Sequence, residues 1–243
     1  SKTASKVTLK LSVNLAGVPD RPTAITIPSG YTFTGAIDGA NFRFQTRQIY
    51  SAADDGTGLY VFTDGLSQRE IIAYEGTSTD KTFYVGESSD RQVYVIPDSN
   101  IDTKTVIVKV FNSATSTGHT VYTPLNQAVT VSSISEYYTI RETPNGFYEL
   151  NFGDGVTFGK SPDAGNKIVV NYLSTSGSLA NGATTFSANS AIVVNGVSYS
   201  PTVVALTKSI SGADLQSIDT IKQLAPAAFA TQQRLVTALD YES

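Results

Sequence analysis

The chain has 243 residues, of which 40% are hydrophobic and only 16% are charged, and its formal net charge is -4. This acidic balance argues against the extended basic surface that nucleic-acid binding requires. The absence of cysteine excludes disulfides, thiolate metal sites and cysteine nucleophiles. The longest apolar stretches, such as residues 106–111, are strand-sized and far shorter than the roughly 20 residues that span a bilayer. We therefore expect neither nucleic acid nor a membrane as a partner.

Residues 1–80 are expected to form a first β region. An alternating strand over residues 7–13 precedes a break rich in Gly and Pro, and strands are expected within 24–33 and over 41–46. Pro28 and Gly30 shape one turn, and Asp38-Gly39 predicts a tight hairpin turn. Short strands at 59–62 and 71–74 complete the region.

Residues 81–180 are expected to form a β domain with the clearest signature in the chain. Strands are predicted at residues 82–85, 92–96, 105–111, 137–141, 147–152 and 167–173. Residues 147–173 are interpreted as a hairpin whose turns use Gly153, Asp154, Gly155 and Gly159. Its aromatic residues are expected to supply core area; they are Phe147, Phe152 and Phe158.

Residues 181–243 are expected to contain a β-hairpin followed by helices. The hairpin is predicted over 191–200, across Asn195-Gly196. The segment from Ser211 to Asp214 has the form of a helix-capping box, and Pro226 is expected to end or kink the helix before a second helical piece at 227–236. An apolar stripe would serve a partner or the chain's own core equally well, and its candidate interface residues are Leu215, Ile218, Ile221, Leu224 and Phe229.

The expected fold class is therefore mainly β (α+β), with antiparallel sandwich-like or barrel-like regions followed by a C-terminal helical segment. The last residues, from Thr237 to Asp240, resemble another helix start only three residues before Ser243. We interpret the sequence as a piece of a longer protein.

Residues 154–161 come close to a phosphate-binding P-loop, with Gly159-Lys160-Ser161 at its end. Asp154 replaces the first glycine of that motif. A P-loop also needs a helix directly after it, whereas Pro162 and a predicted strand follow here. We interpret this segment as a structural turn and expect no nucleotide cofactor.

Two acidic segments have some of the oxygen spacing of a cation site. Residues 98–102 lack the glycine and the distal Glu of a calcium loop, and residues 54–58 also fit an ordinary loop. We interpret both as surface turns and assign no metal site.

Catalytic candidates are few. His119 is the single histidine and follows a Gly- and Ser-rich segment, where a solvated side chain in a loop is expected. Paired carboxylates suit glycoside cleavage, and the formal candidates are Glu75, Glu87, Glu136, Glu142 and Glu149. Glu149 lies in an alternating strand, which predicts an outward-facing residue. We assign no catalytic residue and expect no small-molecule substrate.

Three segments together carry a family pattern. They are residues 25–46, residues 147–181, and residues 211–241 with Ala225-Pro226 between two helical stretches. The central one, from Phe147 to Lys160, is the most specific. In this order the segments resemble the baseplate J-like family of phage tail proteins, although that family continues through a helix that Tyr241 only begins.

The resemblance implies a structural protein of the virion, assembled in the host cytoplasm as part of a contractile tail. It also implies binding to other baseplate wedge proteins and to copies of the chain itself, in a homodimer or a ring around the tail hub. The expected function is thus a non-enzymatic wedge component. The alternative is a glycan-binding or glycan-cleaving tail module, because the chain is rich in tyrosine and carboxylates.

Overall fold

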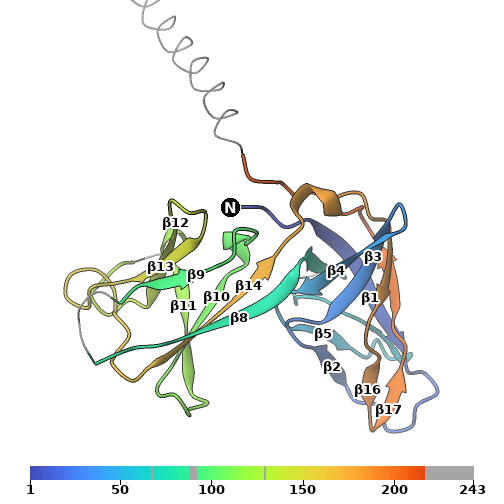
Figure 1. Cartoon of the computed structure of the whole chain (residues 1–243). Helices are drawn as coiled ribbons and strands as arrows, with labels where there is room; N and C mark the ends of the chain where they lie inside the picture. Colours follow the sequence, from blue (N-terminus) through green and yellow to red (C-terminus); the bar gives the residue numbers. More distant parts are fainter. Residues whose placement is uncertain (67, 88–91, 129, 217–243) are drawn as a thin grey trace, which may run out of the picture. The chain divides into compact units, whose positions relative to one another are not determined.

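The computed structural model describes residues 1–66, 68–87, 92–128 and 130–216 (Figure 1). The described part is mainly β, as the sequence predicts. Residues Ser1–Ala213 form one compact unit, and the described residues from Asp214 onward belong to a second. None of the described helical segments is long and apolar enough to cross a membrane.

Short strands follow one another along the whole compact unit. The strands are β1 (Lys6–Asn14), β2 (Ala24–Ile27), β3 (Thr32–Ile37), β4 (Ala40–Thr46), β5 (Tyr50–Ala53), β6 (Leu59–Val61), β7 (Ile71–Glu75), β8 (Thr77–Tyr84), β9 (Tyr94–Ile96), β10 (Ile107–Phe111), β11 (His119–Pro124), β12 (Tyr137–Glu142), β13 (Tyr148–Phe152), β14 (Lys167–Ser174), β15 (Thr185–Ala188), β16 (Ile192–Val194), β17 (Val197–Tyr199) and β18 (Thr202–Ala205). Three 3-10 turns lie among them: η1 (Thr103–Thr105), η2 (Leu125–Gln127) and η3 (Gly177–Ala180).

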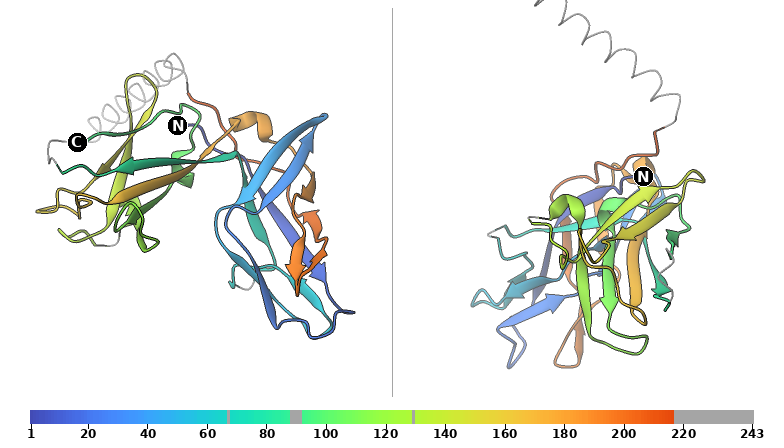
Figure 2. Two further views of the ribbon diagram at one scale, coloured as in Figure 1. Left: turned by 60° about the horizontal axis from the view of Figure 1, so that its bottom comes forward. Right: turned by 90° about the vertical axis from the view of Figure 1, so that its left-hand side faces the viewer.

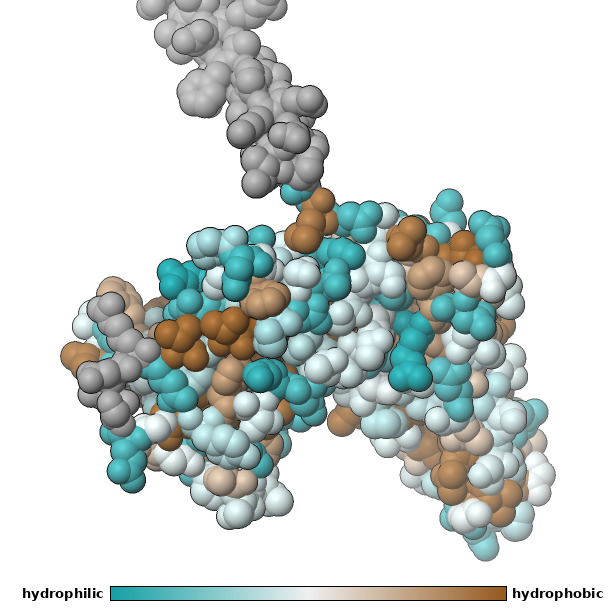
Figure 3. Space-filling model, in the orientation of Figure 1, coloured by the Kyte–Doolittle hydropathy of each residue, from teal (hydrophilic) through white to brown (hydrophobic). Residues whose placement is uncertain are grey.

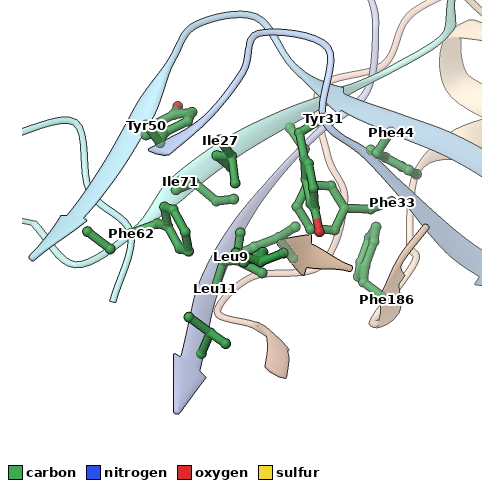
Figure 4. Packing of buried hydrophobic residues seen from close by; sticks show 14 of the residues in the cluster. Leu9, Leu11, Ile27, Tyr31, Phe33, Phe44, Tyr50, Phe62, Ile71 and Phe186 are labelled. Carbon is green, nitrogen blue, oxygen red and sulfur yellow. The ribbon is translucent and has the colours of Figure 1, made fainter. Parts of the chain in front are cut away.

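The first sheet has the order β15-β3-β4-β7-β1-β18, and β6 also pairs with β1. Its edge strands β15 and β18 lie beside each other, so the sheet curls toward closure (Figure 2). In β1 buried residues alternate with less buried ones, because successive side chains of a strand point to opposite faces. The enclosed core is rich in aromatic rings, and those of Phe44 and Phe186 meet edge to face at 5.0 Å (Figure 4).

Two tight hairpins confirm the turn predictions at Asp38-Gly39 and Asn195-Gly196. Asp38 and Gly39 join β3 to β4 with φ values of 48° and 82°. Asn195 and Gly196 join β16 to β17 with φ values of 50° and 77°. Two successive residues with positive φ define the type I′ turn, whose twist matches that of paired strands.

The second sheet has the order β8-β14-β10-β11-β12-β13-β9 and encloses its own core. Its two edges also approach each other, since the rings of Phe83 in β8 and Tyr94 in β9 are 5.4 Å apart. The side chain of Gln92 links the same edges by donating to the Tyr84 carbonyl at 2.6 Å and accepting from the Gly86 amide at 2.9 Å. The pairing of β11 with β12 is parallel, which departs from the expected antiparallel arrangement.

The hairpin expected over residues 147–173 is wrong. Strand β13 pairs with β12 and β9, whereas β14 pairs with β8 and β10. The hairpin that does form joins β12 to β13 through residues 143–147. Phe158 was also misassigned to the core, because its side chain is 61% exposed.

Several other predictions need correction. Strands β5, β11 and β18 were not expected, and His119 begins β11 instead of lying in a loop. The capping box at residues 211–214 begins no helix within the described residues, because Ala213 forms an antiparallel bridge with Thr3. The predicted apolar stripe is not tested, because four of its residues lie outside the described residues: Ile218, Ile221, Leu224 and Phe229.

Hydrogen bonds from buried polar groups connect the two sheets. Glu75 at the end of β7 is 4% exposed, and its carboxylate accepts from the Thr175 hydroxyl at 2.5 Å and the Ser176 amide at 3.0 Å. Asp102 is 3% exposed and accepts from the Ala4 amide at 2.8 Å. A buried acceptor without a partner costs free energy of folding, so these hydrogen bonds stabilise the arrangement of the two sheets.

Arg47 makes a third such connection, from the end of β4. Its guanidinium donates to the Asn171 side chain at 2.7 Å and to the Thr105 carbonyl. Burial lowers the pKa of this guanidinium from its usual value, and the charges of Asp80 and Asp102 act in the opposite direction.

Candidate functional site

The loop after β13 is built around the side chain of Asp154. One carboxylate oxygen accepts from the amides of Val156, Thr157 and Phe158 at 2.9, 2.8 and 2.8 Å. The Asp154 amide in turn donates to the Phe158 carbonyl at 2.9 Å. These amides, that of Phe158 first, hold the pKa of the carboxyl below its usual value. The loop is therefore fixed by its own hydrogen bonds.

The same contacts explain why this segment is not a P-loop. Three consecutive amides converge on one anion, as in a phosphate site, but the anion is the carboxylate of Asp154. Residues 154–166 are turns, bends and irregular structure, and β14 follows them. The Lys160 ammonium lies 3.8 Å from a carboxylate oxygen of Glu136, so the lysine of the P-loop-like motif is paired with an acidic side chain.

Glycines 153 and 159 permit a close approach between the two ends of this loop. A Cβ at Gly153 would collide with the backbone of Phe158 and Gly159. Gly159 has φ +70° and lies against the ring of Tyr137, so a side chain there would be both strained and crowded. Gly155 has φ +72°, but a Cβ there would be in ordinary contact with Ser161 at 3.8 Å and would clash with nothing.

A second loop runs alongside the first. The amides of Gly159 and Lys160 donate to the carbonyls of Ser132 and Ser135 at 2.8 and 2.7 Å. The Ser135 hydroxyl accepts from the Ser132 amide at 2.9 Å, which fixes this second loop locally. Two irregular segments far apart in sequence are thus joined side by side.

Both loops of this pair carry exposed apolar side chains. We call this surface the loop-pair patch, and its residues are Val131, Ile134, Val156 and Phe158, with exposed fractions of 45%, 79%, 80% and 61%. Exposed apolar residues that lie together on ordered loops are typical of protein-protein contact sites. The sequence analysis did not find this patch, because it depends on the contact between two loops.

The remaining turn residues lie where the chain reverses after β2. Gly30 has φ +87°, and its amide donates to the Thr46 carbonyl at 2.7 Å. The carbonyl of Pro28 accepts from the Thr46 hydroxyl at 2.9 Å. These bonds hold the turn against the end of β4.

The two acidic segments are occupied by protein hydrogen bonds. Asp54 forms an ion pair with Arg21 at 2.6 Å and accepts from the amides of Gly56 and Gly58. Arg21 is the main cause that holds the pKa of Asp54 below its usual value. Within residues 98–102, Asp102 is buried rather than part of a surface turn, which corrects the prediction for that residue.

The catalytic candidates are dispersed among the described residues. His119 is exposed, and its ring lies 4.9 Å from that of Phe111. Glu149 pairs with Arg141 at 2.9 Å on the outer face of the second sheet. Glu75, by contrast, is one of the buried carboxylates that connect the sheets. The strand pattern of the sequence alone could not predict that Glu75 is buried.

The described chain is thus a mainly β protein that exposes apolar side chains on loops held by hydrogen bonds. No family model matches the chain. The chain is 28% identical over 240 residues to baseplate wedge protein gp6 of Enterobacteria phage T4. This similarity includes 90% of the chain but only 34% of the phage protein's length. The expected resemblance to phage baseplate proteins is thus supported as a distant similarity.

Proposed function

We propose that the chain is a structural component of a phage tail baseplate, in the wedge of a contractile tail. The observation that supports this most strongly is the similarity to the T4 wedge protein along 90% of the chain. Assembly would take place in the host cytoplasm, and the mature site of action would be the virion. The work of such a component is to hold contacts with neighbouring wedge proteins.

The loop-pair patch is proposed as one contact surface of this assembly. Its four apolar side chains lie on loops that are held by hydrogen bonds, so little ordering is required when a partner covers them. A self-contact, as a homodimer or ring, belongs to the same proposal. Of the stripe predicted to mediate it, Leu215 is 42% exposed.

A pull-down with separately purified wedge proteins of the same phage tests this function. We expect the chain to retain at least one wedge protein, and the double substitution Val156→Lys with Phe158→Lys to weaken retention about tenfold or more. Val121→Lys is the matched control, since Val121 is 54% exposed on β11 and is not one of the patch residues. Retention unchanged by the double substitution would remove the patch from the proposal, and no retention by the wild-type chain would contradict the function.

A glycan-binding or glycan-cleaving tail module is the second candidate. A groove of about 920 Å³ is lined by Glu149, Asp163 and Tyr94 among other residues. Two carboxylates on one groove are the groups that glycoside cleavage uses. A glycan array and a reducing-sugar assay decide between the candidates, because binding of one defined saccharide that is lost in Glu149→Gln would favour the second.

A further inference from the structure

Two strand edges, those of β2 and β16, face each other across a groove beside the core of the first sheet. Strand β2 pairs with β5 on one side, and β16 pairs with β17 on one side. The groove between β2 and β16 has a volume of about 520 Å³ and is lined from both strands, including Ile25, Thr26, Ile192 and Val193. Figure 1 draws the two strands as neighbours, and Figure 3 shows brown apolar surface among white and teal in this region.

Backbone groups on both edges point into this groove. The Thr23 carbonyl accepts from the Asp54 amide on the β5 side, so the alternation of an antiparallel pair directs the amides and carbonyls of Ala24 and Thr26 to the opposite side. On β16, Val194 pairs with Val197 next to the turn, which directs the backbone of Val193 away from β17. Among the residues that the structure describes, none hydrogen-bonds to these outward backbone groups.

The groove has two defined ends. At one end the Tyr31 hydroxyl donates to the Ser190 carbonyl, and beyond the other, outside the residues that line the groove, the Asn195 side chain donates to the Asp20 carbonyl at 3.4 Å. Strands β2 and β16 therefore run in opposite directions along the groove. The stretch between the ends holds about four extended residues at roughly 3.3 Å each.

The floor and walls of the groove determine which segment it fits. Ile27, Tyr31 and Ile192 are buried beneath it in the core of the first sheet, and Figure 4 shows Ile27 and Tyr31 in that core. No charged residue is among those that line the groove. A guest strand would place every second side chain on this apolar floor and the others in solvent.

We propose that this groove binds an extended, uncharged segment of a partner protein by β-strand addition. The guest pairs with β2 through Thr26 on one side and with β16 through Val193 on the other. It therefore alternates apolar with uncharged polar residues over about four positions. A lysine or glutamate on the floor side would be desolvated without a partner, which excludes charged segments. The inference does not rest on the baseplate assignment, because it concerns the isolated chain.

Fluorescence anisotropy with a labelled peptide tests the groove. The probe is Gly-Ser-Val-Thr-Val-Thr-Ser-Gly, and the comparison probe has lysine in place of both valines. We expect saturable binding of the first probe only, and slower hydrogen exchange at the amides of Thr26 and Val193 when it is bound. Absence of saturable binding up to about 1 mM would overturn the proposal.

Substitutions on each edge complete the test. Val193→Lys places a charge in the groove, and Thr26→Pro removes an amide that has no partner among the described residues. Each is expected to weaken probe binding about tenfold or more. Val197→Lys is the matched control, since Val197 is also exposed on the same ribbon but does not line the groove, and binding should change less than about twofold. Equal effects of the three substitutions, or self-association through the groove in place of peptide binding, would contradict the proposal.

Discussion

At the scale of single residues, the loop after β13 depends on glycine at two positions of similar backbone geometry. Gly155 and Gly159 have φ values of +72° and +70°, but only Gly159 lies against a ring, that of Tyr137. Gly155→Ala is expected to reduce the free energy of unfolding by about 1 kcal/mol through backbone strain alone. Gly159→Ala adds a steric clash and is expected to cost about 2–4 kcal/mol. Urea denaturation measures the free energy of unfolding of both variants. Equal losses would contradict the prediction, because they would show that the ring of Tyr137 moves aside without cost.

The carboxylate of Asp154 gives the same loop a defined pH dependence. Hydrogen bonds from backbone amides, that of Phe158 first, lower its pKa in the folded state, so the charged form stabilises the fold above the unfolded pKa of about 3.9. That stability is lost as the pH falls through the lower folded pKa. We expect wild type to exceed Asp154→Asn in stability near neutral pH, with the difference shrinking below about pH 4. Urea midpoints measured from pH 2 to 7 would contradict this if the difference stayed constant.

At the scale of elements, local signals in the sequence predict the turns well. Asp38-Gly39 and Asn195-Gly196 specify their hairpins because both positions need positive φ. Partner choice between strands is not local, which is why the expected pairing of β13 with β14 was wrong. The loop-pair patch and the groove between β2 and β16 likewise depend on contacts between distant segments, so the sequence could not indicate them.

The buried carboxylate of Glu75 connects β7 to the segment after β14. Glu75→Ala would leave the Thr175 hydroxyl and the Ser176 amide without this acceptor, at a cost of about 1–3 kcal/mol. Glu136→Ala is the control, because its 3.8 Å ion pair with Lys160 is solvent-exposed and should change stability by less than about 1 kcal/mol. Thermal unfolding compares the two, and similar shifts would argue against a special role for Glu75.

At the scale of the whole molecule, buried tyrosines should limit stability in alkali. Burial raises the pKa values of Tyr122 and Tyr138 to about 12, and both lie in the core of the second sheet. Because these phenols ionise at about pH 10 in the unfolded chain, unfolding becomes more favourable as the pH rises from 10 towards 12. Absorbance titration at alkaline pH should show a late class of tyrosines that ionise near pH 12 or together with unfolding. Ionisation of all tyrosines near pH 10 with the fold intact would contradict this.

The two enclosed sheets, their connecting carboxylates and the exposed loops together fit a protein whose work is to hold contacts. The distant similarity to a T4 baseplate wedge protein supports such a structural role. It also defines where the chain should be found in a particle. A component of the baseplate must lie at the distal end of the tail and not along the sheath.

Electron microscopy of purified tails, labelled with gold-conjugated antibody against the chain, tests this location most directly. The account predicts label concentrated at the baseplate of intact tails. Label confined to fibres or the sheath, or tails that carry none of the chain, would contradict it.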